Sequence, residues 1–349
     1  MRHTPRRAAT GLAGLALLAT AACGSDAGQS AGRDGASANE ALVVYSGRNE
    51  KLIGPLFEQF TAATGIAVTP RYGGSAELAA QLLEEGSRTP ASIFLSQDAG
   101  ALGAVQEAGG LETLPPTTLD KVPAKYRSGQ GAWVGISGRS RVLIYNSTLV
   151  QAADLPKSVF ELAGPAYKGK VGFAPTNASF QAFVTAMRVT AGEAKTAQFL
   201  TDFAANDPQS FDGNIPIVEA VNAGTIPFGL VNHYYLYEKA AEAGGLDKLN
   251  ARNYLFPGAD PGSLVNVGGV GVLSGKSSPA AQAFVDYLLS TPGQTFFAEQ
   301  TKEYPLVAGV PVDLQGLPPL AELGGPDVDL SQLESLDQTL ALLDKVGIT

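Results

Sequence analysis

The stretch ALVVYSGRNEKLIGPLFEQFTAATGIAVTPRY, residues 41–72, holds the pattern that decides the fold. Its opening ALVVY is rich in apolar and β-branched residues and predicts a strand. Apolar side chains then recur at helical spacing, at Ile53, Leu56, Phe57 and Phe60. Gly65 supplies a stop for this helix, and IAVTPRY predicts a second strand. The stretch therefore predicts a strand, a helix and a strand in succession.

The same alternation continues along the chain. A helix through Leu78, Leu82 and Leu83 is expected to end at Gly86. Further strands are predicted at SIFLS (92–96), WVGIS (133–137), RVLIYN (141–146), KVGFA (170–174), TIPFGLV (225–231), YLFP (254–257) and GGVGVL (268–273). Helices are predicted after SIFLS and at 179–191, 194–204, 279–290 and 292–300. This rhythm predicts an α/β fold with a largely parallel sheet.

These strands are too many for one small sheet, and 349 residues allow two lobes. The stretches 133–145 and 263–273 are long, apolar and punctuated by glycine, which suits crossings that flex as a hinge. We therefore expect two α/β lobes with a cleft between them. The first lobe is expected to hold residues 41–141 plus 265–315, and the second 142–264 plus 316–349.

The composition limits the classes of partner. The net charge is −9, which argues against nucleic-acid binding because contacts to phosphates need clustered Lys and Arg. Cys23 is the only cysteine, so an intrachain disulfide is excluded.

The first 22 residues have the pattern of a secretory signal peptide, in which the basic MRHTPRR precedes a small and apolar run. That run is too short to cross a bilayer. LLATAAC, ending at Cys23, resembles the lipobox of bacterial lipoproteins, which implies lipidation of Cys23 and anchoring to the outer face of the cell membrane. The alternative is a conventional signal peptide cut after Ala22, leaving a free thiol. Residues 23–40 have the composition of a flexible tether.

Polar clusters follow three of the predicted strands, at SGRNE (46–50), SQD (96–98) and NHYY (232–235). Ligands of open α/β sheets bind outside the carboxyl ends of the strands, so these clusters are expected to meet in one cleft. Asn232 can act as N-cap of a helix beginning near His233, which Gly244 and Gly245 end.

VNHYYLY (231–237) concentrates three of eleven tyrosines and one of two histidines in seven residues. Such crowding can be ordinary packing, because tyrosine usually buries its ring and hydrogen-bonds its tip. Adjacent residues do not share a helical face, whereas Tyr234 and Tyr237 do. Tyr234 and Tyr235 can therefore converge on one point only at a helix start or bend.

From about Ala41 onward the chain resembles the ferric-iron-binding proteins of bacterial ABC importers, within the type II periplasmic binding protein superfamily. The resemblance rests on the order of VYSGRNE, FEQFTAATGIAV, EEGSRTPASIFLSQD, SGRSRVLIYN, YKGKVGF, VNHYYLY, VNVGGVGV and EYPL. It implies a two-lobed type II periplasmic-binding-protein fold with a hinge and an interlobe cleft.

The resemblance also implies a ligand set for Fe(III). Tyr234 and Tyr235 match the main iron ligands, and Tyr145 matches a third phenolate of one branch. Oxygen donors suit this hard cation, and since a free phenol has a pKa of about 10, binding should release protons. Where relatives supply a histidine this chain has Asn49 followed by Glu50, and we expect Glu50 to be the replacement donor.

The remaining coordination positions are filled in that family by water or by a small anion such as carbonate or phosphate. Asn177 and Asn214 match anion contacts, while Asn49 and Gln97, which replaces a glutamate, are expected near the metal. Charge compensation is expected from Arg48, Arg139 and Arg141. His233 is expected to line the site, and Tyr237 to pack.

The resulting hypothesis is a monomeric binding protein, not an enzyme, that takes ferric ion or a ferric chelate to an ABC permease. An alternative keeps the fold and changes the ligand to a phosphonate, a phosphate ester or another small anion. A third class, an extracytoplasmic enzyme with Tyr or Glu as acid or base, has little support, because the sequence has no GxSxG, HExxH or P-loop motif.

Overall fold

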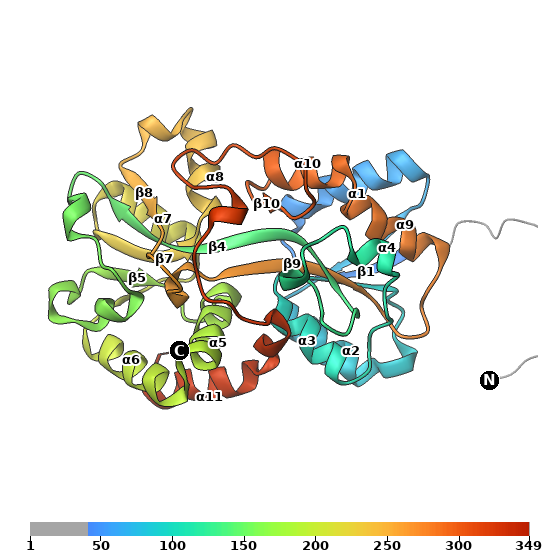
Figure 1. Cartoon of the computed structure of the whole chain (residues 1–349), viewed down its shortest axis with the longest axis horizontal. Helices are drawn as coiled ribbons and strands as arrows, with labels where there is room; N and C mark the ends of the chain where they lie inside the picture. The colour runs from blue at the N-terminus through green and yellow to red at the C-terminus, as the bar shows by residue number, and fades with distance from the viewer. Residues whose placement is uncertain (1–40, 349) are drawn as a thin grey trace, which may run out of the picture. The chain divides into compact units, whose positions relative to one another are not determined.

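The computed structural model describes residues 41–348. The predicted signal peptide, Cys23 and the tether up to residue 40 lie outside the described residues. Within the described part, the strands join in one ten-stranded sheet (Figure 1). Its order is β2 (Val68–Tyr72), β1 (Leu42–Ser46), β3 (Ile93–Ser96), β9 (Val265–Val272), β4 (Val134–Asn146), β7 (Phe228–Asn232), β5 (Val171–Phe173) and β6 (Gln209–Ser210). β8 (Ala251–Tyr254) and β10 (Tyr304–Pro305) each pair with β4.

Helices connect and cover these strands. They are α1 (Glu50–Thr64), α2 (Ser75–Glu85), α3 (Ala99–Glu107), α4 (Pro116–Leu119), α5 (Ala178–Ala191), α6 (Glu193–Ala205), α7 (Asn214–Ala223), α8 (Tyr234–Ala243), α9 (Pro279–Leu288), α10 (Thr291–Glu299) and α11 (Leu336–Val346). The helices predicted at 179–191, 194–204, 279–290 and 292–300 are confirmed as α5, α6, α9 and α10. Among residues 41–348, no helix combines the length and the apolar character needed to cross a membrane.

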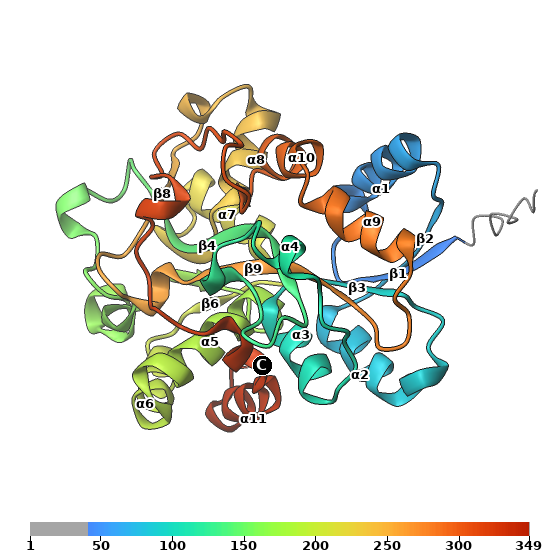
Figure 2. The same ribbon diagram turned by 45° about the vertical axis from the view of Figure 1, so that its right-hand side comes forward.

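The stretch 41–72 folds as its pattern predicts, into β1, α1 and β2. β1 pairs in parallel with β2 and with β3. The side chain of Asn49 accepts a hydrogen bond from the backbone of Lys51 and so caps α1, which ends at Gly65 with a left-handed φ of 74°. The predicted apolar face of α1 is buried, and Phe60 packs edge-on against Phe284 of α9, with ring centroids 5.1 Å apart. Figure 2 shows α1 and α9 side by side.

The middle of the sheet differs from the expectation of a largely parallel arrangement. β4 pairs antiparallel with β9 along its first part and with β7 along its second part. β9 in turn pairs antiparallel with β3, so only the two outer parts of the sheet are parallel. The physical reason is topological. β4 carries the chain from one part of the sheet to the other and β9 brings it back, so the two strands run in opposite directions.

The larger hydrophobic cores divide the chain at these two crossing strands. One core gathers around β1, β3 and β9 with α1 and α9, and includes Trp133 and Phe284. A second core gathers around β5 and β7 with α5 and α6, and includes Phe180 and Phe203, while a third covers the other side of β7 under α7 and α8. The exact lobe boundaries expected from the sequence stay a prediction.

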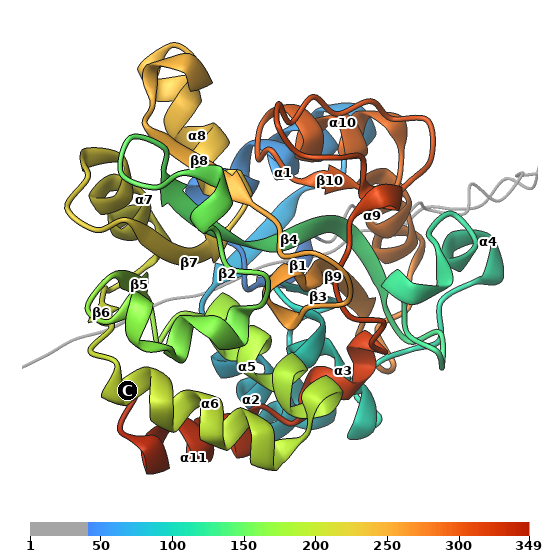
Figure 3. The same cartoon turned by 60° about the vertical axis from the view of Figure 1, so that its left-hand side comes forward.

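The C-terminal segment takes part in two cores. Leu330 and Leu333 join the core beside α3, whereas Leu343 and Ile348 join the core around α5 and α6. Figure 3 shows α11 lying along α6. Buried Arg188 of α5 holds this segment by donating to the carbonyl of Ser335 and to Oγ1 of Thr339, each at 2.8 Å.

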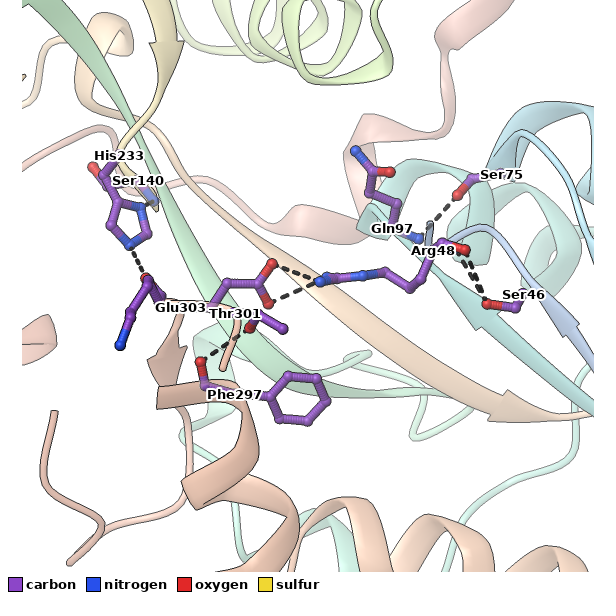
Figure 4. A network of polar contacts seen from close by, with 10 residues as sticks. Ser46, Arg48, Ser75, Gln97, Ser140, His233, Phe297, Thr301 and Glu303 are labelled. Carbon is purple, nitrogen blue, oxygen red and sulfur yellow. Dashed lines mark hydrogen bonds and ion pairs between the residues drawn. The ribbon is translucent and has the colours of Figure 1, made fainter. Parts of the chain in front are cut away.

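A buried ion pair joins the end of β1 to the residue before β10. Nη1 and Nη2 of Arg48 donate to the two carboxylate oxygens of Glu303 at 3.2 and 2.7 Å, across 255 positions of sequence (Figure 4). Arg48 is 4% exposed and Glu303 is fully buried. Burial by itself would raise the pKa of Glu303, but the charges of Arg48 and Arg139 outweigh it, so that pKa lies below its ordinary value. Both partners are therefore charged at neutral pH.

Removing one member of this pair should destabilise the fold strongly. Glu303→Gln leaves the Arg48 charge buried without a counter-charge, and we expect a loss of about 3–5 kcal/mol in the free energy of unfolding, measured by urea denaturation. The control is Asp247→Asn, because the Asp247–Lys248 pair is 71% and 61% exposed and should change stability by less than about 0.5 kcal/mol. An effect of Glu303→Gln as small as that of the control contradicts the prediction.

The same pair predicts a pH dependence. Because the pKa of Glu303 is lowered in the folded protein, its contribution is complete above its ordinary pKa of 4.5 and is lost as the pH falls through the folded value. The stability difference between the wild type and Glu303→Gln should therefore be constant near neutral pH and shrink below about pH 4.5. Denaturation curves of both proteins across this range measure it, and a difference that does not change with pH would refute the assignment.

Candidate metal centre

The tyrosine pair opens α8, directly after β7. The rings of Tyr234 and Tyr235 lie 4.2 Å apart between centroids, with 33° between their planes. Tyr234 is 3% exposed and Tyr235 is half-buried. Successive helical residues point about 100° apart, yet the two long side chains meet in the first turn of α8. The structure thus brings together the two phenols that the sequence singles out.

The cap of α8 differs from the expectation. Asn232 is the last residue of β7, and His233 stands at the N-cap without a side-chain cap hydrogen bond. The backbone N–H of His233 donates to the carbonyl of Ser140 in β4, so the strand ladder continues one residue further than the sequence pattern indicates. Asn232 instead lines a small cavity together with Arg139 and Arg141.

His233 is held on both ring nitrogens. Its Nδ1 accepts from the backbone N–H of Ser140 at 3.1 Å, and its Nε2 lies 3.0 Å from the carbonyl of Lys302, to which it donates (Figure 4). Complete burial lowers the pKa of His233 to about 4, against the opposing effect of Glu303. The ring is therefore neutral and has no free nitrogen for a metal.

Three buried arginines surround the pair. Arg48 is occupied by Glu303, whereas Nε of Arg139 and of Arg141 has no hydrogen-bond partner among the described residues. Arg141 donates to Oγ of Ser179 at 3.1 Å and to the carbonyl of Leu230 at 2.9 Å. Burial lowers the pKa of Arg141 to about 9, while the phenols of Tyr235 and Tyr234 act in the opposite direction. The site therefore favours negative charge on whatever occupies it.

Burial and nearby positive charges shift the pKa of Tyr234 in opposite directions. Burial and the neighbouring Tyr235 raise its pKa well above the ordinary value, and Arg139 and Arg48 offset only part of that rise. Without a cation, Tyr234 is therefore a neutral phenol. A metal ion that binds here has to displace its proton, which couples binding to pH.

A small cavity lies beside Arg139 and Arg141, whose charges act on the tyrosines, with about 10 Å³ available to the centre of a water-sized sphere, which is room for about one water molecule. It is lined by Gln97, Asp98, Arg139, Arg141, Ala178, Ser179, Asn232, Leu264 and Asn266. Two of these residues are buried arginines, and two lie at the N-terminus of α5, where free N–H groups favour an anion.

Asn177 and Asn214 stand behind this cavity. Oδ1 of Asn177 accepts from the backbone N–H of Ser179 at 3.0 Å, and Nδ2 of Asn214 donates to the same oxygen at 3.1 Å. They orient Ser179, which does line the cavity. Gln97 also lines it, and its backbone N–H donates to Oγ of Ser75 (Figure 4).

The structure does not bring Tyr145 to the pair. Tyr145 is opposite Phe228 in the β4–β7 ladder, while Arg141, beside the site, is opposite Asn232. Four residues of strand separate Tyr145 from Arg141 by about 13 Å. The side chain of Tyr145 packs on the second core. Tyr145 therefore stands at the end of β4 that lies away from the site.

Asn49 and Glu50 stand at the start of α1, and their expected place at the metal stays a prediction. Asn49 is exposed, and its side-chain oxygen is used to cap α1. Glu50 is exposed in the first turn of α1, and its charge acts on Tyr72, whose pKa burial and Glu50 raise. Both residues are accounted for by the start of a helix.

Two carboxylates near the site were not predicted. Glu303 belongs to the EYPL stretch, but nothing local in the sequence points to its partner Arg48. Glu238 of α8 lies one turn after the tyrosines, and burial together with the charge of Glu303 raises its pKa to about 7. The four-residue spacing from Tyr234 to Glu238, about one helical turn, was the sequence feature that could have pointed to Glu238. Among residues 41–348, no group of three or more His, Cys, Asp or Glu side chains could hold a metal ion.

Comparisons with known proteins agree with this arrangement. Residues 88–329 match the model of the family described as bacterial extracellular solute-binding protein. The chain is 36% identical over 319 residues to the Fe(3+)-binding periplasmic protein of Serratia marcescens, covering 91% of this chain and 93% of that protein.

Two solved structures are similar throughout. Iron-bound HitA from Pseudomonas aeruginosa has a TM-score of 0.82 at 35% identity, covering 88% of this chain and 99% of that one. FutA from Trichodesmium, in complex with iron and citrate, has a TM-score of 0.75 at 30% identity, covering 89% and 100%. The two-lobed periplasmic-binding-protein fold expected from the sequence is confirmed. The chain belongs to the bacterial extracellular solute-binding proteins, alongside relatives named for binding ferric iron.

Proposed function

We propose that this protein captures ferric iron outside the cytoplasm and delivers it to an ABC permease in the membrane. The observation that carries the proposal is the contact between the Tyr234 and Tyr235 rings in the first turn of α8. The similarity to proteins named for ferric-iron binding supports the same cargo. Two phenol oxygens at one point suit a hard, highly charged cation better than thiolate or imidazole would.

Binding of the metal ion displaces the phenol proton of Tyr234. Burial keeps Tyr234 protonated, and an arriving Fe(III) stabilises the deprotonated phenolate by direct coordination. Arg48 and Arg139 assist because their charges favour the ionised form of Tyr234. Binding therefore weakens in acid, where protons compete for the same oxygens.

A small anion completes the coordination of the metal. The small cavity has the charge that such an anion requires, with Arg139 and Arg141 buried at its wall and Ser179 at the N-terminus of α5. Carbonate or phosphate suits this cavity by charge. The cavity has room for about one water molecule, so it has to widen for carbonate or phosphate, and further for a chelator such as the citrate bound in the Trichodesmium protein.

The same cavity favours one alternative ligand class. The unpaired Nε atoms of Arg139 and Arg141 would also suit a phosphonate or a phosphate ester without any metal. This alternative makes Tyr234 and Tyr235 part of the wall rather than ligands. The two functions therefore differ in the role of the phenols, and only phenols that bind iron give the complex a colour.

The setting of the protein is proposed from the sequence and from its relatives. The relatives are named as periplasmic or extracellular binding proteins, and we propose the same transport role without enzymatic activity. We also propose that Cys23 carries the lipid anchor and that the protein acts as a monomer. The permease would recognise the protein after it has closed on its cargo.

The test is the colour of the ferric complex. Purified protein mixed with ferric citrate should become coloured through phenolate-to-iron charge transfer and gain thermal stability. Tyr235→Phe should lose most of the colour and more than about tenfold in affinity for ferric ion. Tyr237→Phe is the matched control, because Tyr237 lies on the same helix and donates to the carbonyl of Gln315 at 2.8 Å. Tyr145→Phe should also keep the colour.

The alternative gives the opposite pattern. If the wild type stays colourless and gains no thermal stability with iron, but is stabilised by a phosphonate, the iron proposal is wrong.

A further inference from the structure

Glu238 lies one helical turn beyond the tyrosine pair. It follows Tyr234 by four residues and Tyr235 by three on α8. Residues at these spacings are neighbours on one side of a helix, and helical side chains lean toward the N-terminus. By its spacing, Glu238 therefore lies one turn from both tyrosines on α8.

One oxygen of Glu238 is buried and unused. Its Oε1 has no hydrogen-bond partner among the described residues, although it is closed off from solvent. The other buried acids near the site are occupied. Both oxygens of Glu303 accept from Arg48, and Asp98 accepts from the backbone N–H of Ala101 as the cap of α3. A buried carboxylate oxygen without a partner is costly and calls for an explanation.

The Arg48–Glu303 pair places Glu238 and Tyr234 in one electrostatic environment. The charges of Arg48 and Glu303 act on Tyr234 and also on Glu238. Tyr235 shares this environment, because its phenol acts on Arg48 as well. The buried ion pair thus interacts electrostatically with three oxygen-bearing side chains of α8.

We propose that Glu238 supplies a carboxylate oxygen to the ferric ion held by Tyr234 and Tyr235. This assignment rests on the proposed function. It supplies an additional oxygen donor from α8 itself, whereas Tyr145 lies four residues along β4 from Arg141. It also balances charge, since two phenolates and one carboxylate neutralise Fe(III), which leaves Arg139 and Arg141 to the anion.

The test compares two glutamates of the same helix. Glu238→Gln keeps the shape of the side chain and removes its charge, while Glu242→Gln does the same to an exposed acid that pairs with Lys239. Ferric affinity is measured by competition with citrate. Glu238→Gln should lose about 10- to 100-fold, and Glu242→Gln should stay within about twofold of the wild type.

A second readout separates a ligand from a residue that acts through its neighbours. Replacing a carboxylate by the weaker amide donor leaves the iron more electron-poor, so the phenolate-to-iron band of Glu238→Gln should move to longer wavelength. The apo form of Glu238→Gln should unfold at the same or a higher denaturant concentration than the wild type, because the variant no longer buries an unpaired carboxylate. A lost affinity then reflects the site and not the fold.

The outcomes are distinct from those for the function as a whole. A coloured wild type with a Glu238→Gln variant of unchanged affinity and band position overturns the assignment of Glu238 alone. A lower affinity with an unchanged band position also overturns it, because it makes Glu238 a positioning residue. A colourless wild type overturns the proposed function itself.

Discussion

The ion pair between Arg48 and Glu303 is the constraint on which the site depends. It joins the end of β1 to the segment before β10 in a fully buried setting, where neither charge could stand alone. The adjacent residue, Lys302, offers its carbonyl to Nε2 of His233, the residue that precedes the tyrosine pair. Two successive residues therefore fix β1 on one side and the start of α8 on the other. Lys302 holds a left-handed φ of 55°, a conformation that costs a residue with a side chain about 1 kcal/mol and persists because these two contacts over-determine it.

This arrangement explains the electrostatics of the tyrosines. Burial alone would make Tyr234 a poor ligand, and the guanidinium groups alone would make the cleft repel a cation. Glu303 neutralises Arg48, so the charge left for an occupant comes from Arg139 and Arg141. The centre is thus divided into an oxygen-rich part on α8 and a cationic part on β4. A cation and an anion that bind together satisfy both parts, whereas either alone satisfies only one.

Much of the fold follows from local pattern, and less of the site does. The spacing of Ile53, Leu56, Phe57 and Phe60 predicts α1 because burial of one helical face is a local property. The antiparallel centre of the sheet could not be predicted in this way, since the direction of β4 relative to β9 depends on how the chain returns. The tyrosine pair was visible because its members are adjacent in sequence. Glu303 was not, because its partner lies 255 positions away. Tyr145 was misplaced because a position near a strand end does not say which end of the sheet the residue faces. Glu50 as a metal ligand stays a prediction.

The C-terminal segment has a consequence for how the protein unfolds. It places Leu330 and Leu333 in the core beside α3 and Leu343 and Ile348 in the core around α5, so it is a third connection between them in addition to β4 and β9. An opening of one core must break contacts along all three connections at once. Because three segments of the chain connect the two cores, unfolding should be cooperative. The two halves should unfold in a single transition even though each has its own apolar core.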